Sequence, residues 1–294
     1  MQFKTYVQKN KPVYMYIHGE CLSAFSFQEE IRELKKDYTL IVPVLDGHGS
    51  EAQKPFISIQ QCAEELLTYL QEYYNGHIQV LSGFSLGAQI AVSMLSMKPD
   101  LCEYAMIESA MMQPIKLQSW SAYAGIYTNA LARKKWFNKF MYYTIFNDDF
   151  AFEDYYQNYQ AMTKENLKSI HHAVSTFQLP ENLAQATCKT AILVGQREKK
   201  SMKKSADLLK EVLGDAQIFM LMNYTHGDFS LGNPREYLRF VKSWIQNKEI
   251  QQKRKVRKQK EQQEGDYLPN WKHLVNKIKN KKSKEKAAEG RLLK

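Results

Sequence analysis

Residues 77–100 read HIQVLSGFSLGAQIAVSMLSMKPD, and this stretch decides the fold class. Its first part, 77–85, is an apolar run of strand length, and its second part, 86–100, has apolar residues at helical spacing. The motif G-F-S-L-G, centred on Ser85, lies where the two parts meet. A strand that turns into a helix at G-x-S-x-G is typical of a nucleophile elbow, because side chains beside the serine would obstruct so tight a turn. The alternative interpretation is a loop serine that caps the helix.

Strand-like and helix-like segments alternate on both sides of this stretch. The strand patterns cover residues 12–19, 38–49, 103–110, 189–195 and 216–223, and the helix patterns cover 24–37, 58–74, 203–214 and 233–246. Near-continuous apolar strands that alternate with amphipathic helices indicate a parallel sheet with both faces covered. We therefore expect the α/β class, with a mostly parallel central sheet and helices on both faces.

The alternation stops between residues 111 and 186, a stretch that is rich in aromatic residues such as Trp120, Tyr123 and Trp136. The stretch has a helical pattern and no clear strand. We expect it to form a helical cap over the sheet's carboxyl edge. The predicted organisation is a core of 1–110 and 187–247, a cap of 111–186, and a basic tail of 248–294.

The distribution of charge and the spacing of the cysteines indicate which binding partners and which cellular compartment to expect. The net charge of +10 resides in residues 248–294, which hold 16 Lys/Arg and 6 Asp/Glu, so the body of the chain is neutral. The four cysteines are widely spaced and lack the spacing of a zinc site. The first residues lack the apolar run of a signal peptide. We expect a reduced, cytoplasmic protein without a metal or other cofactor.

A serine hydroxyl needs a base, and the base needs an acid that orients it. His226 follows the last predicted strand and precedes the last predicted helix, which is the position that the Ser-acid-His order requires. The acid should follow the strand 189–195, where Glu198 is the first carboxylate. Glu108, at the end of the preceding strand, is the alternative acid.

Acyl transfer also needs two backbone N–H groups that hold the developing oxyanion. The first is expected from Leu86, immediately after Ser85. The second is expected from the loop HGECLS after the first long strand, where the amide of Glu20 or of Cys21 could face the pocket.

Four motifs, YIHGE, LDGHGS, GFSLGA and THGD, occur in this order and together resemble the α/β-hydrolase superfamily, especially its lipase-like, esterase-like and MenH-like branches. The resemblance covers residues 12–247 and implies a variable cap at 111–186. It also implies Ser85 and His226 as nucleophile and base, Glu198 as acid, and Glu20 with Leu86 as oxyanion donors.

The function expected from these residues is hydrolysis of a carboxylic ester or thioester through an acyl intermediate on Ser85. The alternative is a weakly active or inactive binding protein with a hydrolase-like scaffold that acts through its cap or tail. Three readings of the tail stay open: a solubilising extension, an amphipathic helix at 267–282 on an anionic membrane, or a segment that binds nucleic acid. The sequence does not fix the oligomeric state.

Overall fold

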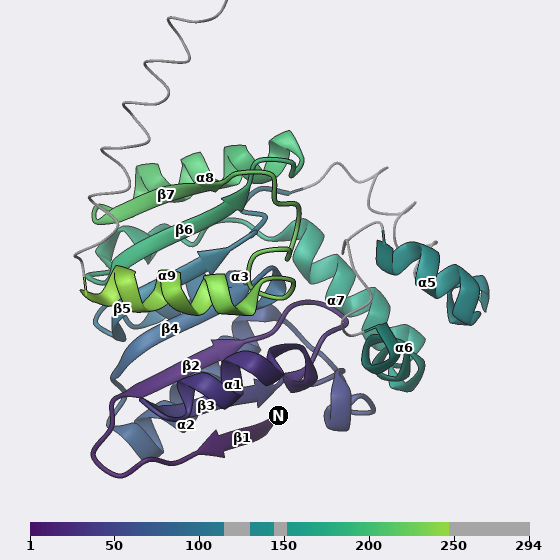
Figure 1. Ribbon diagram of the computed structural model, residues 1–294, viewed down its shortest axis with the longest axis horizontal. Coiled ribbons are helices and arrows are strands. Elements are labelled where there is room, and N and C mark those ends of the chain that lie inside the picture. Colours follow the sequence, from purple (N-terminus) through teal and green to yellow (C-terminus); the bar gives the residue numbers. More distant parts are fainter. Residues whose placement is uncertain (115–129, 144–151, 247–294) are drawn as a thin grey trace, which may run out of the picture. The chain divides into compact units, whose positions relative to one another are not determined.

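The computed structural model describes residues 1–114, 130–143 and 152–246. Within these residues, seven strands form one sheet in the order β1-β3-β2-β4-β5-β6-β7 (Figure 1). β1 runs antiparallel to β3, and the other neighbouring pairs are parallel. The expected α/β class with a mostly parallel sheet is confirmed. The strands are β1 Gln2–Tyr6, β2 Val13–Ile17, β3 Thr39–Val44, β4 Ile78–Phe84, β5 Cys102–Glu108, β6 Lys189–Gly195 and β7 Ala216–Leu221.

The helices of the described residues follow the strands closely in the chain, as the alternating pattern predicts. Each predicted helix of the core has a counterpart, although the boundaries differ by up to a few residues because helix ends fray. The helices are α1 Gln28–Leu34, α2 Ile59–Tyr74, α3 Leu86–Met97, α5 Lys135–Tyr143, α6 Phe152–Ala161, α7 Lys164–Thr176, α8 Lys200–Val212 and α9 Pro234–Gln246.

The strand β2 shows how the two faces of the sheet are covered. Side chains alternate along a strand, so Tyr14 and Tyr16 lie on the same face. There the Tyr16 ring stacks on Phe27 with 3.9 Å between centroids, and the Tyr14 hydroxyl lies 3.1 Å from that of Tyr237 in α9. α3 packs against β2, β4 and β5 and covers the other face (Figure 1). Burial on both faces explains the continuous apolar strands.

The edge strand β1 is missing from the sequence prediction. Its five residues, Gln2–Tyr6, are partly polar, and Gln2 and Lys4 are exposed. A short, partly polar edge strand pairs with a single neighbouring strand and needs no continuous apolar run, so it leaves little hydrophobic signal.

The parallel strands direct four predicted site residues to one edge of the sheet. Ser85 directly follows β4, Glu108 ends β5, Glu198 lies in the turn after β6, and His226 lies in the loop after β7. Because the carboxyl ends of parallel strands meet at the same edge, residues far apart in the chain gather there.

The region between β5 and β6 contains three helices, α5, α6 and α7, and no strand among its described residues. This agrees with the helical insertion expected there, while Trp120, Tyr123 and the tail after residue 246 lie outside the described residues. Met1–Val241 forms one compact unit that contains both the core and these helices. The helices in the described part of the chain are too short or too polar to span a bilayer.

Candidate active site

Ser85 lies at a sharp turn between β4 and α3. Its backbone has a φ of +52°, which is uncommon for a residue other than glycine, and its side chain makes no capping hydrogen bond to α3. A Cβ at Gly83 would overlap the carbonyl oxygen of Gly87, and a Cβ at Gly87 would overlap that of Ile17 in β2. The two glycines therefore let the turn close, and the strained backbone sets the direction of the serine hydroxyl.

His226 lies next to this serine. Its Nε2 is 3.2 Å from Ser85 Oγ, and its Nδ1 is 3.1 Å from Glu198 Oε2. An ionised carboxylate only accepts hydrogen bonds, so Nδ1 carries the hydrogen and Nε2 is left to accept the serine proton. The loop is shaped by Asp228, whose Oδ2 accepts hydrogen bonds from the N–H and hydroxyl of Thr225.

Glu198 is buried and held by several donors. Its Oε1 accepts hydrogen bonds of 2.8 Å from both the Gly195 N–H and the Ser109 hydroxyl. Burial acts to raise the pKa of this carboxyl, but hydrogen bonding and attraction from His226, with the Gly195 and Ser109 donors, outweigh it and hold the pKa below 4.5. The side chain is therefore an ionised acceptor in contact with the imidazole.

Glu108, the alternative acid, lies at the end of β5 with a different set of contacts. It is 3% exposed, and its Oε1 accepts a hydrogen bond of 3.2 Å from the Ser230 N–H. Within the described residues its Oε2 has no hydrogen-bond partner. Burial raises the pKa of this carboxyl to about 7. The structure thus brings Ser85, His226 and Glu198 into one hydrogen-bonded series and leaves Glu108 beside it.

The comparisons with solved structures identify this architecture. A thermophilic esterase from Thermogutta terrifontis, solved with malate, aligns with a TM-score of 0.69 and 17% identity over 84% of this chain and 93% of its own. MenH from S. aureus aligns with a TM-score of 0.63 and 16% identity over 83% of this chain and 98% of its own. The chain has the α/β-hydrolase fold.

Comparison of sequences relates a smaller part of this chain to known proteins than comparison of structures does. No family model matches the chain. An uncharacterised hydrolase, YugF of Bacillus subtilis (strain 168), is 32% identical over 100 residues, which is 34% of this chain and 37% of the relative. The match thus spans little more than a third of that protein's length. The resemblance seen in the four sequence motifs is confirmed at the level of the fold.

Two loops of this α/β-hydrolase fold hold the backbone amides that we expect to bind an oxyanion. Leu86 is the first helical residue after Ser85, a position at which the N–H has no partner within the helix. Glu20 and Cys21 both line the pocket, and the oxyanion role expected for one of their amides stays a prediction. The Glu20 carboxylate lies 3.3 Å from His171 Nδ1 in α7, and Cys21 has a φ of +59°.

A pocket of about 360 Å³ opens at Ser85 and His226. Its wall includes Tyr155 of α6 and Val174 of α7, so the inserted helices complete it. These helices are tied to core loops by Asn158, which donates a 2.6 Å hydrogen bond to the Cys21 carbonyl and accepts one of 2.6 Å from the Gly49 N–H. The remaining lining residues are Glu20, Cys21, Phe84, Gln89, Ser109, Met111, Arg197, Glu198, Lys199, Met202 and Thr225.

Two buried histidines near the pocket are structural. His18 Nε2 accepts a hydrogen bond of 3.1 Å from the Leu45 N–H, and its Nδ1 donates one of 2.9 Å to the Gly19 carbonyl. Burial, with the nearby His48 ring, lowers the pKa of His18 to about 3. Burial also lowers the pKa of His48 to about 4. Both rings are neutral at physiological pH and shape the loops beside Ser85.

Sequence reasoning missed two polar residues of the site. Ser109, which donates to Glu198, directly follows Glu108 at the end of β5, and its position at a strand end is the signal that could have found it. Gln89 stands four residues after Ser85, and this helical spacing places it one turn along α3. It is fully buried and lines the pocket.

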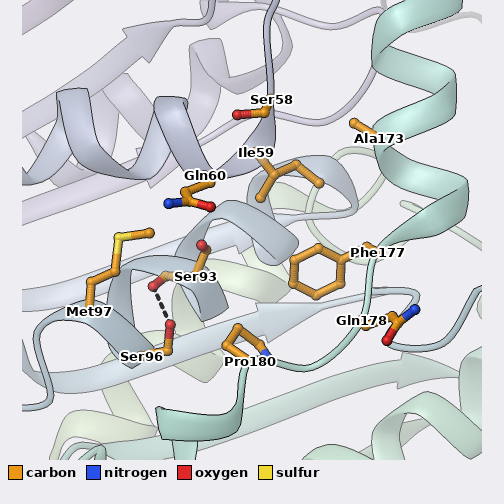
Figure 2. A pocket seen from close by; sticks show the side chains of 10 residues that line it. All are labelled: Ser58, Ile59, Gln60, Ser93, Ser96, Met97, Ala173, Phe177, Gln178 and Pro180. Atoms are coloured by element: carbon orange, nitrogen blue, oxygen red, sulfur yellow. Dashed lines mark hydrogen bonds between the residues drawn. The ribbon is translucent and has the colours of Figure 1, made fainter.

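A second pocket, of about 460 Å³, is lined by a different set of residues (Figure 2). It is formed by the start of α2, the end of α3 and the end of α7 with the segment that follows. It shares no lining residue with the pocket at Ser85, and it contains no residue that the sequence predicts to be functional. Its lining residues are Ser58, Ile59, Gln60, Ser93, Ser96, Met97, Ala173, Phe177, Gln178 and Pro180.

Proposed function

We propose that the protein is a serine hydrolase that cleaves carboxylic esters or thioesters through an acyl-enzyme intermediate on Ser85. The observation that carries the proposal is the hydrogen-bonded series from Ser85 through His226 to Glu198 at the wall of a pocket. The fold shared with the Thermogutta terrifontis esterase supports the same reaction class.

In the first half-reaction, Ser85 Oγ attacks the acyl carbon of the substrate while His226 Nε2 takes the hydroxyl proton. The negative charge that develops on the carbonyl oxygen is held by the N–H of Leu86 and by that of Glu20 or Cys21. Collapse of this intermediate breaks the bond to the alkoxide or thiolate, which leaves with the proton from His226. An ester of Ser85 with the acyl group remains.

In the second half-reaction, water attacks the acyl carbon and His226 takes one of its protons. The new intermediate collapses, Ser85 leaves with that proton, and the product is a carboxylic acid. Glu198 keeps its hydrogen bond to Nδ1 throughout and balances the positive charge that the imidazole carries in each step. The lowered pKa of Glu198 supports this role, since the carboxylate stays ionised at neutral pH.

The pocket supports an acyl or alcohol group of moderate size. Its volume of about 360 Å³ lies at the lower end of the range for small-molecule sites. Apolar side chains, among them Phe84, Met111, Val174 and Met202, form much of its wall. An apolar group of the substrate would gain free energy by leaving water there.

The test is labelling of the full-length protein with a fluorophosphonate probe, followed by mapping of the modified peptide. We expect modification at Ser85, loss of labelling in Ser85→Ala, and unchanged labelling in Ser96→Ala, a control on α3 outside this pocket. Glu198→Ala should lower kcat on a reactive ester by roughly 10³- to 10⁴-fold. An unlabelled native protein, beside a known serine hydrolase that reacts in the same tube, would refute the proposal.

A further inference from the structure

The turn from Gly19 to Leu22 has a backbone shape that is unfavourable for its sequence. The Leu22 N–H donates a hydrogen bond of 3.2 Å to the Gly19 carbonyl, so Glu20 and Cys21 form the middle of the turn. Cys21 has a φ of +59°, a left-handed conformation that favours glycine and strains a residue with a Cβ. Such a conformation persists only where the surrounding structure holds it.

The two amides in the middle of this turn are not used by the fold. Among the residues that the structure describes, the N–H groups of Glu20 and Cys21 donate no hydrogen bond. Both residues line the pocket at Ser85. Most backbone N–H groups of a folded chain are paired, so two unpaired ones in succession at a pocket call for an explanation. The proposed mechanism needs one such donor for its oxyanion.

Asn158 of α6 holds one end of the turn. Its Nδ2 donates a hydrogen bond of 2.6 Å to the Cys21 carbonyl, and its Oδ1 accepts one of 2.6 Å from the Gly49 N–H. One partner can only accept and the other can only donate, so the orientation of the Asn158 amide is determined. The residue is 6% exposed, and water therefore competes little for either bond.

The Gly19 carbonyl holds the other end of the turn. It accepts a hydrogen bond of 2.9 Å from His18 Nδ1 in addition to the one from Leu22. A peptide group is planar, so the Gly19 carbonyl and the Glu20 N–H move as one unit. The Cys21 carbonyl and the Leu22 N–H form a second unit, and the Cys21 N–H belongs to the peptide between the two. Fixing both units therefore restricts the direction of both unpaired amides.

We propose that Asn158 is a positioning residue for catalysis: its hydrogen bond to the Cys21 carbonyl keeps the unpaired amides of the Gly19–Leu22 turn in the direction that the oxyanion requires. This inference rests on the proposed function. Tyr155, three residues before Asn158 on α6, lines the pocket. The inserted helix α6 therefore contributes to the rate of the reaction as well as to the pocket wall.

The test measures how fast Ser85 reacts with a fluorophosphonate, whose phosphoryl oxygen takes the place of the oxyanion. Asn158→Ala removes the bond to Cys21. Asn166→Ala is the matched control, because Asn166 of α7 is 4% exposed and donates hydrogen bonds of 2.9 Å to two carbonyls in the core loop 52–54. We expect labelling to be roughly 10- to 100-fold slower in Asn158→Ala and unchanged in Asn166→Ala, with thermal unfolding showing both variants folded.

Two further measurements separate the turn from the hydrogen-bonded series at Ser85. In Asn158→Ala the labelling rate should fall by the same factor from about pH 6 to 9, with an unchanged midpoint, because the contacts of His226 are intact. Asn158→Asp is a second variant, whose ionised carboxylate still accepts from the Gly49 N–H but cannot donate to the Cys21 carbonyl. It should therefore also react slowly.

Each contrary outcome has a distinct meaning. Equal labelling rates in the native protein, Asn158→Ala and Asn158→Asp overturn the inference. A fall of the same size in Asn166→Ala also overturns it, because the effect would then reflect general anchoring of the inserted helices. A shifted pH midpoint in Asn158→Ala overturns it by placing the effect on His226. Failure of the native protein to react refutes the proposed function, and that result involves no variant of Asn158.

Discussion

Glu108→Gln should make the protein more stable at alkaline pH and not at acid pH. Glutamine has nearly the shape of a protonated glutamate and carries no charge at any pH. Its oxygen can still accept from the Ser230 N–H, the bond that Glu108 Oε1 accepts. The carboxyl is 3% exposed, so its ionised form is poorly solvated in the folded protein.

The magnitude follows from the pKa of Glu108. Burial raises this pKa from 4.5 to about 7, and a difference of roughly 2.5 corresponds to about 3 kcal/mol. The folded protein holds the proton more tightly than the unfolded chain does. The stabilising contribution is therefore complete below pH 4.5 and is lost as the pH rises to about 7. The free energy of unfolding of Glu108→Gln, relative to that of the native protein, should therefore rise by about 3 kcal/mol between these two pH values.

Urea unfolding at pH values from 4 to 8.5 measures this difference in the free energy of unfolding. Glu103→Gln is the matched control, because Glu103 is exposed on the same strand, β5. We expect the Glu108→Gln difference to rise with pH and the Glu103→Gln difference to stay flat. A constant difference between Glu108→Gln and the native protein would refute a buried, protonated Glu108.

Three further perturbations follow from the site. Gly87→Ala should lower the free energy of unfolding by about 1 to 3 kcal/mol and reduce labelling of Ser85, because the new Cβ would overlap the Ile17 carbonyl. Gly214→Ala is the control: a Cβ there would have no atom within 4 Å, so thermal unfolding should be unchanged. Ser109→Ala removes a donor from ionised Glu198 and should lower the free energy of unfolding by about 1.5 to 3 kcal/mol at pH 7. The loss should shrink as the pH falls and Glu198 becomes protonated, and a loss that does not change with pH contradicts this. Of the three readings of residues 248–294, which carry the net charge, the membrane reading predicts that their deletion abolishes sedimentation with anionic vesicles and preserves the labelling; vesicle binding by the truncated protein would exclude the tail as the anchor.

The sheet could be predicted from the sequence to the extent that its strands are buried on both faces. β4, for example, is almost entirely enclosed between helices, so its apolar run is continuous and its end at the glycine turn is sharp. β1 escaped prediction because an edge strand needs no such run. The helical character of the insertion could also be predicted, but the sequence gives no sign that Asn158 joins α6 to the loops at Cys21 and Gly49, since that contact depends on tertiary packing.

Some candidate site residues have a local marker in the sequence and others do not. Ser85 and His226 are marked by local features, a glycine-bounded turn and a loop after the last strand. The choice between Glu198 and Glu108 has no local marker, because both follow or end neighbouring parallel strands and reach the same edge of the sheet. Gln89 was missed because nothing local distinguishes it from an ordinary buried helix residue.

The surroundings of the two carboxylates, more than their positions, decide which of them can serve His226. Burial acts to raise the pKa of Glu198, but hydrogen bonding and attraction from His226, together with the Gly195 and Ser109 donors to Oε1, lower it and keep the carboxylate ionised. Glu108 Oε1 accepts a hydrogen bond from the Ser230 N–H, and burial raises the pKa of this carboxyl to about 7, which leaves it largely protonated in mildly acidic solution. A protonated acid cannot balance the imidazolium that the proposed mechanism forms on His226. Even with equal access to His226, Glu198 would therefore stabilise the charged ring over a wider range of pH.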